Sequence, residues 1–178
     1  MIFRRMLRAA KLEVGLFEEV EADKGSTVEA MGAVVLSSLA AGIGMTSVGS
    51  GGNFIAGTIG ALVGWWVWAF LSYFIGTKIL PEPQTHADLG ELLRTIGFAS
   101  SPGAILILGI LHPTVAGFLN LVAFVWMTAA MVLAVRQALD YKGTGRAVAV
   151  VVIAGLLQLL VRFLIIVLIV GMTAGPGA

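Results

Sequence analysis

The sequence predicts an all-α integral membrane protein, in which an N-terminal amphipathic interfacial helix precedes a bundle of five spanning helices. Of its 178 residues, 58% are hydrophobic and 12% are charged, a balance far from that of a soluble domain. Five apolar runs are each long enough to cross a bilayer. Of the eleven Lys and Arg residues, ten lie in three polar stretches, and the eleventh, Arg162, lies inside the last run. This alternation is typical of a multi-pass membrane protein.

Residues 1–26 form the predicted cytoplasmic amphipathic segment. Within residues 2–20, apolar side chains recur at spacings of four and three, the period of one helix face: Phe3, Leu7, Ala10, Val14 and Phe17. The first half also carries four basic residues, so the helix is expected to lie on anionic lipid head groups. The alternative is a helix packed on the protein's own cytoplasmic loops. No apolar core with a cleavage site follows the basic start, so no cleavable signal peptide is expected.

Residues 27–173 form the predicted membrane domain, and residues 174–178 form a tail. The five spans are expected at about 28–48, 54–77, 92–111, 114–135 and 147–170. The short turn 49–53 makes the first two spans an antiparallel hairpin. Small residues recur at every fourth position on both: Ala33, Ser37 and Ala41, then Ala56, Gly60 and Gly64. These two stripes are expected to face each other, because small side chains let two backbones approach closely.

The third span is the least regular. Thr85-His86-Ala87-Asp88 offers a capping box before it. Pro102 interrupts it, and the apolar piece that follows reaches only about half a bilayer at ~1.5 Å per residue. A re-entrant loop would deliver Arg136, Lys142 and Arg146 to the outside, against the positive-inside bias. Crossing is therefore predicted, with the N-terminus in the cytoplasm and the C-terminus outside.

Arg162 is the ionisable residue predicted to lie deepest in the hydrocarbon. Gln158 is one turn away on the same helix face, and Asn120 of the fourth span lies at similar depth. Arg162, Gln158 and Asn120 are therefore the candidate intramembrane polar site. The functional interpretation is a site for a substrate or a lipid head group, and the structural one is an arginine that snorkels outward or ties helices together.

Other chemistry is not supported. A serine hydrolase would need a serine and a histidine on one membrane face, and Ser50 and His112 are both predicted outside. However, the Gly/Ser turn lacks a nucleophile elbow, and no carboxylate is predicted outside to orient the histidine. His86 and His112 are predicted on opposite faces, so no metal site is expected. The chain has no cysteine, and its net charge of +1 makes nucleic acid an unexpected partner. No catalytic residue and no cofactor is predicted.

The segment Gly97-Phe98-Ala99-Ser100-Ser101-Pro102 resembles the signature of the Ypt-interacting-protein (Yip) domain family, with Phe98 where tyrosine is usual. The likeness covers roughly residues 17–172, and the chain looks like the small bacterial members. It implies a five-span α-helical protein of the bacterial inner membrane with no known enzymatic activity. Eukaryotic relatives bind prenylated Rab-type GTPases and one another. This chain lacks their long N-terminal region and its Asp-Leu-Tyr-Gly-Pro motif, so a Rab-type GTPase is not an expected partner.

The predicted function is that of a non-enzymatic scaffold or membrane-organising subunit. It would bind membrane lipids, other membrane proteins or itself through its spans and its amphipathic segment, while Gly97, Phe98 and Pro102 set the bend of the third span. The alternative is a small transporter or channel built around the Pro102-broken span and Arg162. A water-accessible cavity that reaches Arg162 would favour the alternative, and a dry, packed arginine would exclude it.

Overall fold

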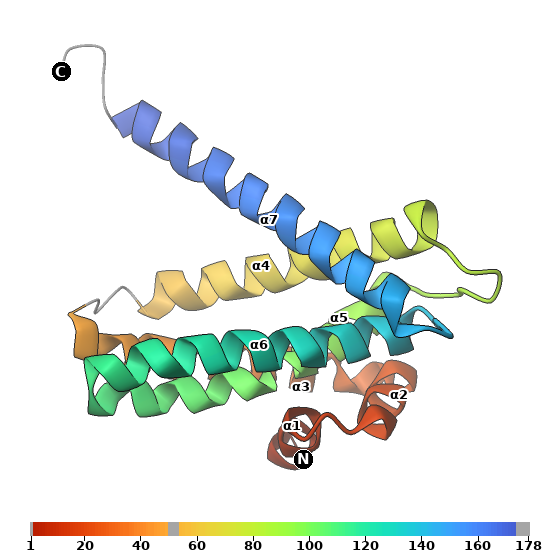
Figure 1. Ribbon diagram of the computed structural model, residues 1–178, viewed down its shortest axis with the longest axis horizontal. Helices are drawn as coiled ribbons and strands as arrows, with labels where there is room; N and C mark the ends of the chain where they lie inside the picture. The colour runs from red at the N-terminus through yellow and green to blue at the C-terminus, as the bar shows by residue number, and fades with distance from the viewer. Residues whose placement is uncertain (1, 50–53, 174–178) are drawn as a thin grey trace.

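The computed structural model describes residues 2–49 and 54–173, and within these ranges every regular element is a helix (Figure 1). Five helical stretches are long and apolar enough to cross a membrane: Lys24–Val48, Gly57–Ile79, Leu89–Leu111, Pro113–Ala138 and Thr144–Ile165. The predicted all-α class with five membrane helices is thus confirmed.

Two helices, not one, make up the N-terminal segment. α1 (Ile2–Ala10) and α2 (Val14–Ala22) are separated at Leu12, whose φ is +60°. The prediction of one helix over residues 2–20 is therefore wrong. A left-handed leucine costs about 1–2 kcal/mol, but the bend turns α2 onto the bundle and buries its apolar side chains completely: Leu16, Phe17 and Val20.

α3 (Thr27–Gly44) follows the turn η1 (Lys24–Ser26) and ends in η2 (Met45–Val48), and α4 (Phe54–Phe74) continues into a π-helical turn, η3 (Ile75–Ile79). Most of their connection lies outside the described residues. The predicted small-residue stripes do not pack directly on each other, although Ala41, Gly60 and Gly64 line one groove between the two helices. Ser37 lies against Gly103 of the third span, and a Cβ at Gly60 would meet nothing within 4 Å. The third span carries glycines of its own, so it is the element that approaches α3 most closely.

The third span consists of α5 (Leu89–Ala99) and η4 (Ser101–Leu111). The predicted capping box is misplaced by three residues: Asp88 is the N-cap, its carboxylate accepts from the Glu91 N–H, and the Glu91 carboxylate accepts from the Asp88 N–H, both at 2.8 Å. The Thr85 hydroxyl instead accepts from the Glu82 N–H. Thr85 thus closes a turn before the helix, and Asp88 has the acidic partner that a box needs.

The helix changes character at Pro102. η4 is a 3-10 helix of 11 residues, and its first bond runs from the Gly103 N–H to the Ser100 carbonyl at 2.9 Å. A 3-10 helix rises about 2.0 Å per residue, compared with about 1.5 Å in an α-helix. Together α5 and η4 reach roughly 38 Å, more than the ~30 Å of hydrocarbon. The same residues wound entirely as an α-helix would reach roughly 34 Å, so α5 supplies the length that the piece after Pro102 lacks, and the tighter winding of η4 adds about 5 Å.

α6 (Pro113–Ala138) lies beside both parts of the third span, η4 and α5, and α7 (Thr144–Thr173) crosses α4 and then diverges from the other helices (Figure 1). We call the end that carries Lys78, Arg136, Lys142 and Arg146 the basic end. The largest fully buried side chains, including Phe17, Phe98 and Leu139, belong to one core cluster that joins the N-terminal helices to the spans. The described side chains of α7 from residue 159 to residue 168 are exposed.

Candidate functional site

The two N-terminal helices are held on the bundle at their carbonyl ends. Arg94 of α5 is only 4% exposed, and its guanidinium donates to the carbonyls of Val20, at 2.9 Å, and Glu21. The Trp126 Nε1–H of α6 donates to the Ala10 carbonyl at 2.8 Å. Both donors meet carbonyls at a helix C-terminus that lack an intrahelical partner, and the helix dipole there also favours the cationic Arg94. The bundle therefore caps α1 and α2.

Sequence reasoning missed Arg94. It was counted with the polar stretch before the third span, whereas the structure buries it, and Arg162, predicted to be the deepest cation, is exposed. The available signal was its position among Leu92, Leu93 and Ile96, the apolar side chains of an amphipathic helix. A basic residue on such a face needs a carbonyl or a carboxylate within reach.

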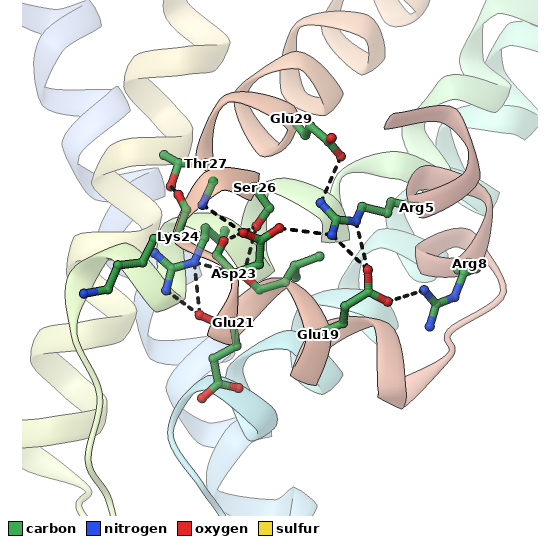
Figure 2. Close-up of polar contacts among 12 residues, drawn as sticks. Arg5, Arg8, Glu19, Glu21, Asp23, Lys24, Ser26, Thr27 and Glu29 are labelled. Carbon is green, nitrogen blue, oxygen red and sulfur yellow. Dashed lines mark hydrogen bonds and ion pairs between the residues drawn. The ribbon is translucent and has the colours of Figure 1, made fainter. Parts of the chain in front are cut away.

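Ion pairs join α1 to its neighbours. Figure 2 shows Arg5 between three carboxylates, with nitrogen–oxygen distances of 2.9 Å to Glu19, 3.1 Å to Asp23 and 3.2 Å to Glu29. Arg8 pairs with Glu19 as well. Hydrogen bonds from Arg8, and then from Arg5, hold the pKa of the Glu19 carboxyl below its ordinary value. We call α1, α2 and these ion pairs the N-terminal platform.

The platform has one face on the bundle and one exposed. Met6 and Ala9 of α1 are buried, whereas Phe3 is 73% and Leu7 58% exposed. The exposed Lys11 follows Leu7 by one turn, on the same side of the helix. The predicted apolar face is therefore divided: Phe17 packs into the core, and the α1 part remains available as an apolar and basic surface.

Arg162 and Gln158 meet at a glycine of α4. The Gln158 amide nitrogen donates to the Gly64 carbonyl at 3.2 Å. A Cβ at Gly64 would lie 3.2 Å from this nitrogen and 3.3 Å from Nη2 of Arg162. Gln158 is 5% exposed, whereas Arg162 is exposed, and among the described residues its guanidinium forms no hydrogen bond or ion pair. Two of the three predicted site residues thus come together.

Two hollows that share lining residues border this pair. A groove of about 820 Å³ lies between α3, α4 and α7, and a smaller cavity of about 280 Å³ extends between α3, α4, the third span and α6. Gly64, Gln158 and Arg162 line both. In the smaller cavity, buried polar atoms have no hydrogen-bond partner in the described part of the chain: Ser37 Oγ, Trp68 Nε1 and Gln158 Oε1. We call the two hollows together the Arg162 groove.

Asn120 lies apart from the Arg162 groove. It is exposed, and its amide donates to the Ala116 carbonyl of its own helix at 2.8 Å and to the Met45 sulfur at 3.8 Å. Its side chain lines neither hollow of the Arg162 groove. Ser37 and Trp68 take the place that the sequence assigned to Asn120, and their spacing gave no signal that would have identified them.

The predicted family motif is a packing site. A Cβ at Gly97 would lie 2.8 Å from Cβ and 3.1 Å from the carbonyl oxygen of Ala30, so glycine is what lets α5 approach α3. Phe98 is fully buried, and Pro102 is buried where the α-helix changes to a 3-10 helix. These residues position helices and present no reactive group.

Ser50 lies outside the described residues. His112 caps α6, since its Nδ1 accepts from the Thr114 N–H at 3.2 Å. Among the described residues, no three His, Asp or Glu side chains come close enough together to hold a metal ion.

Comparison with known proteins gives one finding. The family model of the Yip1 domain matches residues 21–173, which is most of the chain. No curated protein and no solved structure gives a significant match.

Proposed function

The chain belongs to the Yip1 domain family, and on that premise we propose that it is a non-enzymatic scaffold or membrane-organising protein. It binds lipids and other membrane proteins, or a second copy of itself, in a bacterial cytoplasmic membrane. The family is not known as a family of enzymes. The observation that carries the proposal is the N-terminal platform, which is fixed on the bundle by Arg94 and Trp126 and exposes an apolar and basic face.

The location of α1 supports a role at the membrane surface. It runs across the long axis of the bundle (Figure 1), so it lies parallel to the membrane plane. Its contact, Trp126, is roughly 20 Å along α6 from Pro113, so about 10 Å of the ~30 Å hydrocarbon remains between it and the proposed cytoplasmic boundary. An interfacial helix buries its apolar face about 5–10 Å into that boundary. Phe3 and Leu7 suit the acyl chains, and Lys11 suits the lipid phosphates.

The proposed orientation puts the basic end in the cytoplasm. Gln137 near the end of α6 donates to Glu18 of α2 at 2.8 Å, and Arg146 at the start of α7 lies 3.6 Å from Glu82. The platform and the basic loops are thus on the same side, which the positive-inside bias assigns to the cytoplasm. Five crossings then bring the C-terminus to the outside.

Affinity purification from native membranes in a mild detergent tests this function. We expect the wild-type protein to retain a membrane protein or a second copy of itself in a fixed ratio, measured by quantitative mass spectrometry. Arg94→Gln removes the cap on α2, loosens the platform and lowers retention about tenfold, the scale of one charge-assisted hydrogen bond. Lys142→Gln, which removes an exposed charge, is the matched control. A wild-type protein that purifies alone contradicts the scaffold.

A small transporter or channel is the second candidate, and one observation favours it. The cavity beside Arg162 is also lined by Ser100 and Gly103, which flank the proline break. The chain has no cysteine, so Ser37→Cys gives a single thiol inside that cavity. Transport predicts that a membrane-impermeant maleimide labels this thiol from both sides of the membrane. The scaffold predicts no labelling from either side.

A further inference from the structure

We propose that the larger hollow of the Arg162 groove is a docking site for a transmembrane helix of a different membrane protein, one that carries an Asp or Glu in the outer third of its span. The carboxylate pairs with the Arg162 guanidinium, and the backbone of the docked helix lies against the glycines of α4. The inference rests on the scaffold function proposed above, and it names the class of partner and the place where that partner binds.

The glycines of α4 form a helix-packing surface that no described helix of this chain uses. Where the third span approaches α3, a Cβ at Gly97 or Gly44 would collide with the neighbouring backbone. At Gly57 and Gly60, which line the hollow, a Cβ would meet nothing within 4 Å among the described residues. Inside a membrane, small residues let two helix backbones approach closely. The uncovered face of α4 therefore suits a helix from another chain.

The divergence of α7 leaves room for that helix. α7 meets α4 where a Cβ at Gly155 would lie 3.4 Å from the Trp68 ring. Farther from the basic end α7 leaves α4 (Figure 1), and the hollow of about 820 Å³ lies between the α4 glycines and the side chains of Val161 and Ile165. A docked helix would thus contact both α4 and α7 beyond the point where they cross.

Arg162 lines this hollow and lacks a counter-charge. Among the described residues its guanidinium has no hydrogen bond or ion pair, although it carries five N–H donors. The ten acidic residues of the chain lie within residues 13–29 and 82–91 or at 140, toward the basic end, and none of them lines the hollow. A carboxylate matches a guanidinium through two parallel hydrogen bonds. The counter-charge for Arg162 is therefore expected from another chain.

The depth of the site determines where the partner carries its carboxylate. Nη2 of Arg162 lies 3.3 Å from the position of a Cβ on Gly64. Gly64 is roughly 21 Å along α4 from Lys78 at the basic end, which leaves about 9 Å of the ~30 Å hydrocarbon on the outer side. An arginine at that depth is costly unless it is paired. The acidic residue of the partner is thus expected about six residues from the outer end of its span.

Two other occupants fit the site less well. A phospholipid held by its phosphate would direct its acyl chains inward, whereas the walls of the hollow lie outward of Arg162. A second copy in the same orientation would bring its own Arg162 to the same depth, and its acidic residues all lie toward the basic end. Like charges at one depth repel each other. A different membrane protein satisfies both the charge and the direction of the hollow.

Energy transfer in liposomes between the full chain and a designed single-span peptide tests the site. The chain has no cysteine, so Lys142→Cys gives a single thiol for the donor dye. The peptide is a Leu-Ala helix of about 20 residues with one Glu about six residues from its outer end, and its matched control carries Gln there.

We expect the Glu peptide to bind about tenfold more tightly than the Gln peptide, because only the carboxylate forms charge-assisted hydrogen bonds with Arg162. Arg162→Gln abolishes this preference. Arg162→Glu transfers the preference to a peptide that carries Lys at the same position, which would not follow if Arg162 only supported the fold.

Two glycines give a test that leaves the charge unchanged. Gly60→Leu fills the hollow and is expected to weaken binding of the Glu peptide at least tenfold. Gly117→Leu adds the same side chain on α6, at another exposed glycine where a Cβ would meet nothing within 4 Å, and leaves binding unchanged. Gel filtration and thermal unfolding of each variant confirm that it is folded.

Several results would overturn the docking site. Equal binding of the two peptides by the wild-type protein, or an unchanged preference in the folded Arg162→Gln variant, means that Arg162 does not recognise a carboxylate. Energy transfer between two copies of the chain that Gly60→Leu abolishes means that a second copy occupies the hollow. Co-purified phospholipid that Gly60→Leu removes means that a lipid occupies it. A native partner that the wild-type protein and Gly60→Leu retain equally supports the scaffold but places its contact elsewhere, so the two proposals fail separately.

Discussion

Single atoms decide how closely the helices of this bundle can approach. Gly97 lets the backbone of α5 touch Ala30 of α3, and Gly64 makes room for the two polar side chains of α7. At Gly44, a Cβ would overlap the Leu106 carbonyl oxygen, so α3 and η4 meet there with no side chain between them. These three glycines matter because a side chain would not fit at their positions, and not because they adopt a backbone conformation that other residues avoid. Gly57, Gly60 and Gly117 are open and have no such role.

Gly97→Ala is expected to destabilise the protein by about 1–3 kcal/mol, because the added methyl group would lie 2.8 Å from Ala30 Cβ in a packed core. Thermal unfolding in detergent measures this effect. Gly117→Ala is the matched control, since nothing lies within 4 Å of its Cβ. Equal midpoints for the two variants would show that the α3–α5 contact adapts easily.

Glu21 makes stability depend on pH. Burial, and then repulsion by Asp140 and Glu91, raises the pKa of its carboxyl to about 7. The folded protein therefore holds a proton that the unfolded chain releases above its ordinary pKa of 4.5. Stability falls as the pH rises from about 4.5 to about 7, because ionisation is easier in the unfolded state. Below about pH 4.5, Glu21 is protonated in both states and no longer changes the stability with pH.

Glu21→Gln is expected to flatten the dependence of the unfolding midpoint between pH 4.5 and 7, and Asp140→Asn is expected to reduce it, since one repelling charge is removed. Glu13→Gln, on the far side of the platform, serves as the control. If the Glu21→Gln variant keeps the wild-type slope, another group carries the pH dependence.

At the scale of elements, the third span combines an α-helix with a 3-10 helix. Pro102 has no N–H to donate, and the chain after it winds as a 3-10 helix. The pitch of η4 also decides which of its residues face α3, and Leu106 and Gly109 are the ones that meet Gly44. The proline break and the close contact at Gly44 thus depend on each other.

Pro102→Ala restores an N–H and lets α5 continue. An α-helical η4 would be roughly 5 Å shorter over its 11 residues, which moves Leu106 and Gly109 out of register with Gly44. We expect a lower unfolding midpoint and altered retention of protein partners. Pro113→Ala is the control, because proline is well tolerated at the first position of a helix, where Pro113 begins α6. Unchanged retention by Pro102→Ala would remove the motif from the function.

Local rules predicted the elements but not their partners. The five apolar runs and the amphipathic start depend on length and period, which the sequence carries directly. The break at Leu12 could not be predicted, because leucine rarely adopts a left-handed conformation and only the packing of α2 makes it favourable here. The burial of Arg94 and the pairing of Gln158 with Gly64 depend on how the helices are placed relative to one another. The periodicity of the sequence does not predict that placement.

At the scale of the whole molecule, the two ends differ. Toward the basic end, the platform, α5 and α6 share a continuous core of fully buried side chains, including Phe17, Phe98 and Leu139. Toward the other end, α7 leaves the bundle, and Leu159, Phe163 and Leu168 are each more than 60% exposed. The first end suits a rigid support for a surface helix, and the second leaves space for a partner helix.

The central claim is that the exposed face of α1 engages the membrane and partner proteins. Photo-crosslinking in intact native membranes tests it most directly, with a photoreactive residue placed at Phe3 or Leu7 and, as matched controls, at the buried Met6 or Ala9. Positions 3 and 7 are predicted to yield adducts with lipids and with a membrane protein or a second copy of the chain. Positions 6 and 9 are predicted to yield only intramolecular adducts. Intermolecular adducts from the buried positions, or none from Phe3 and Leu7, would contradict the claim.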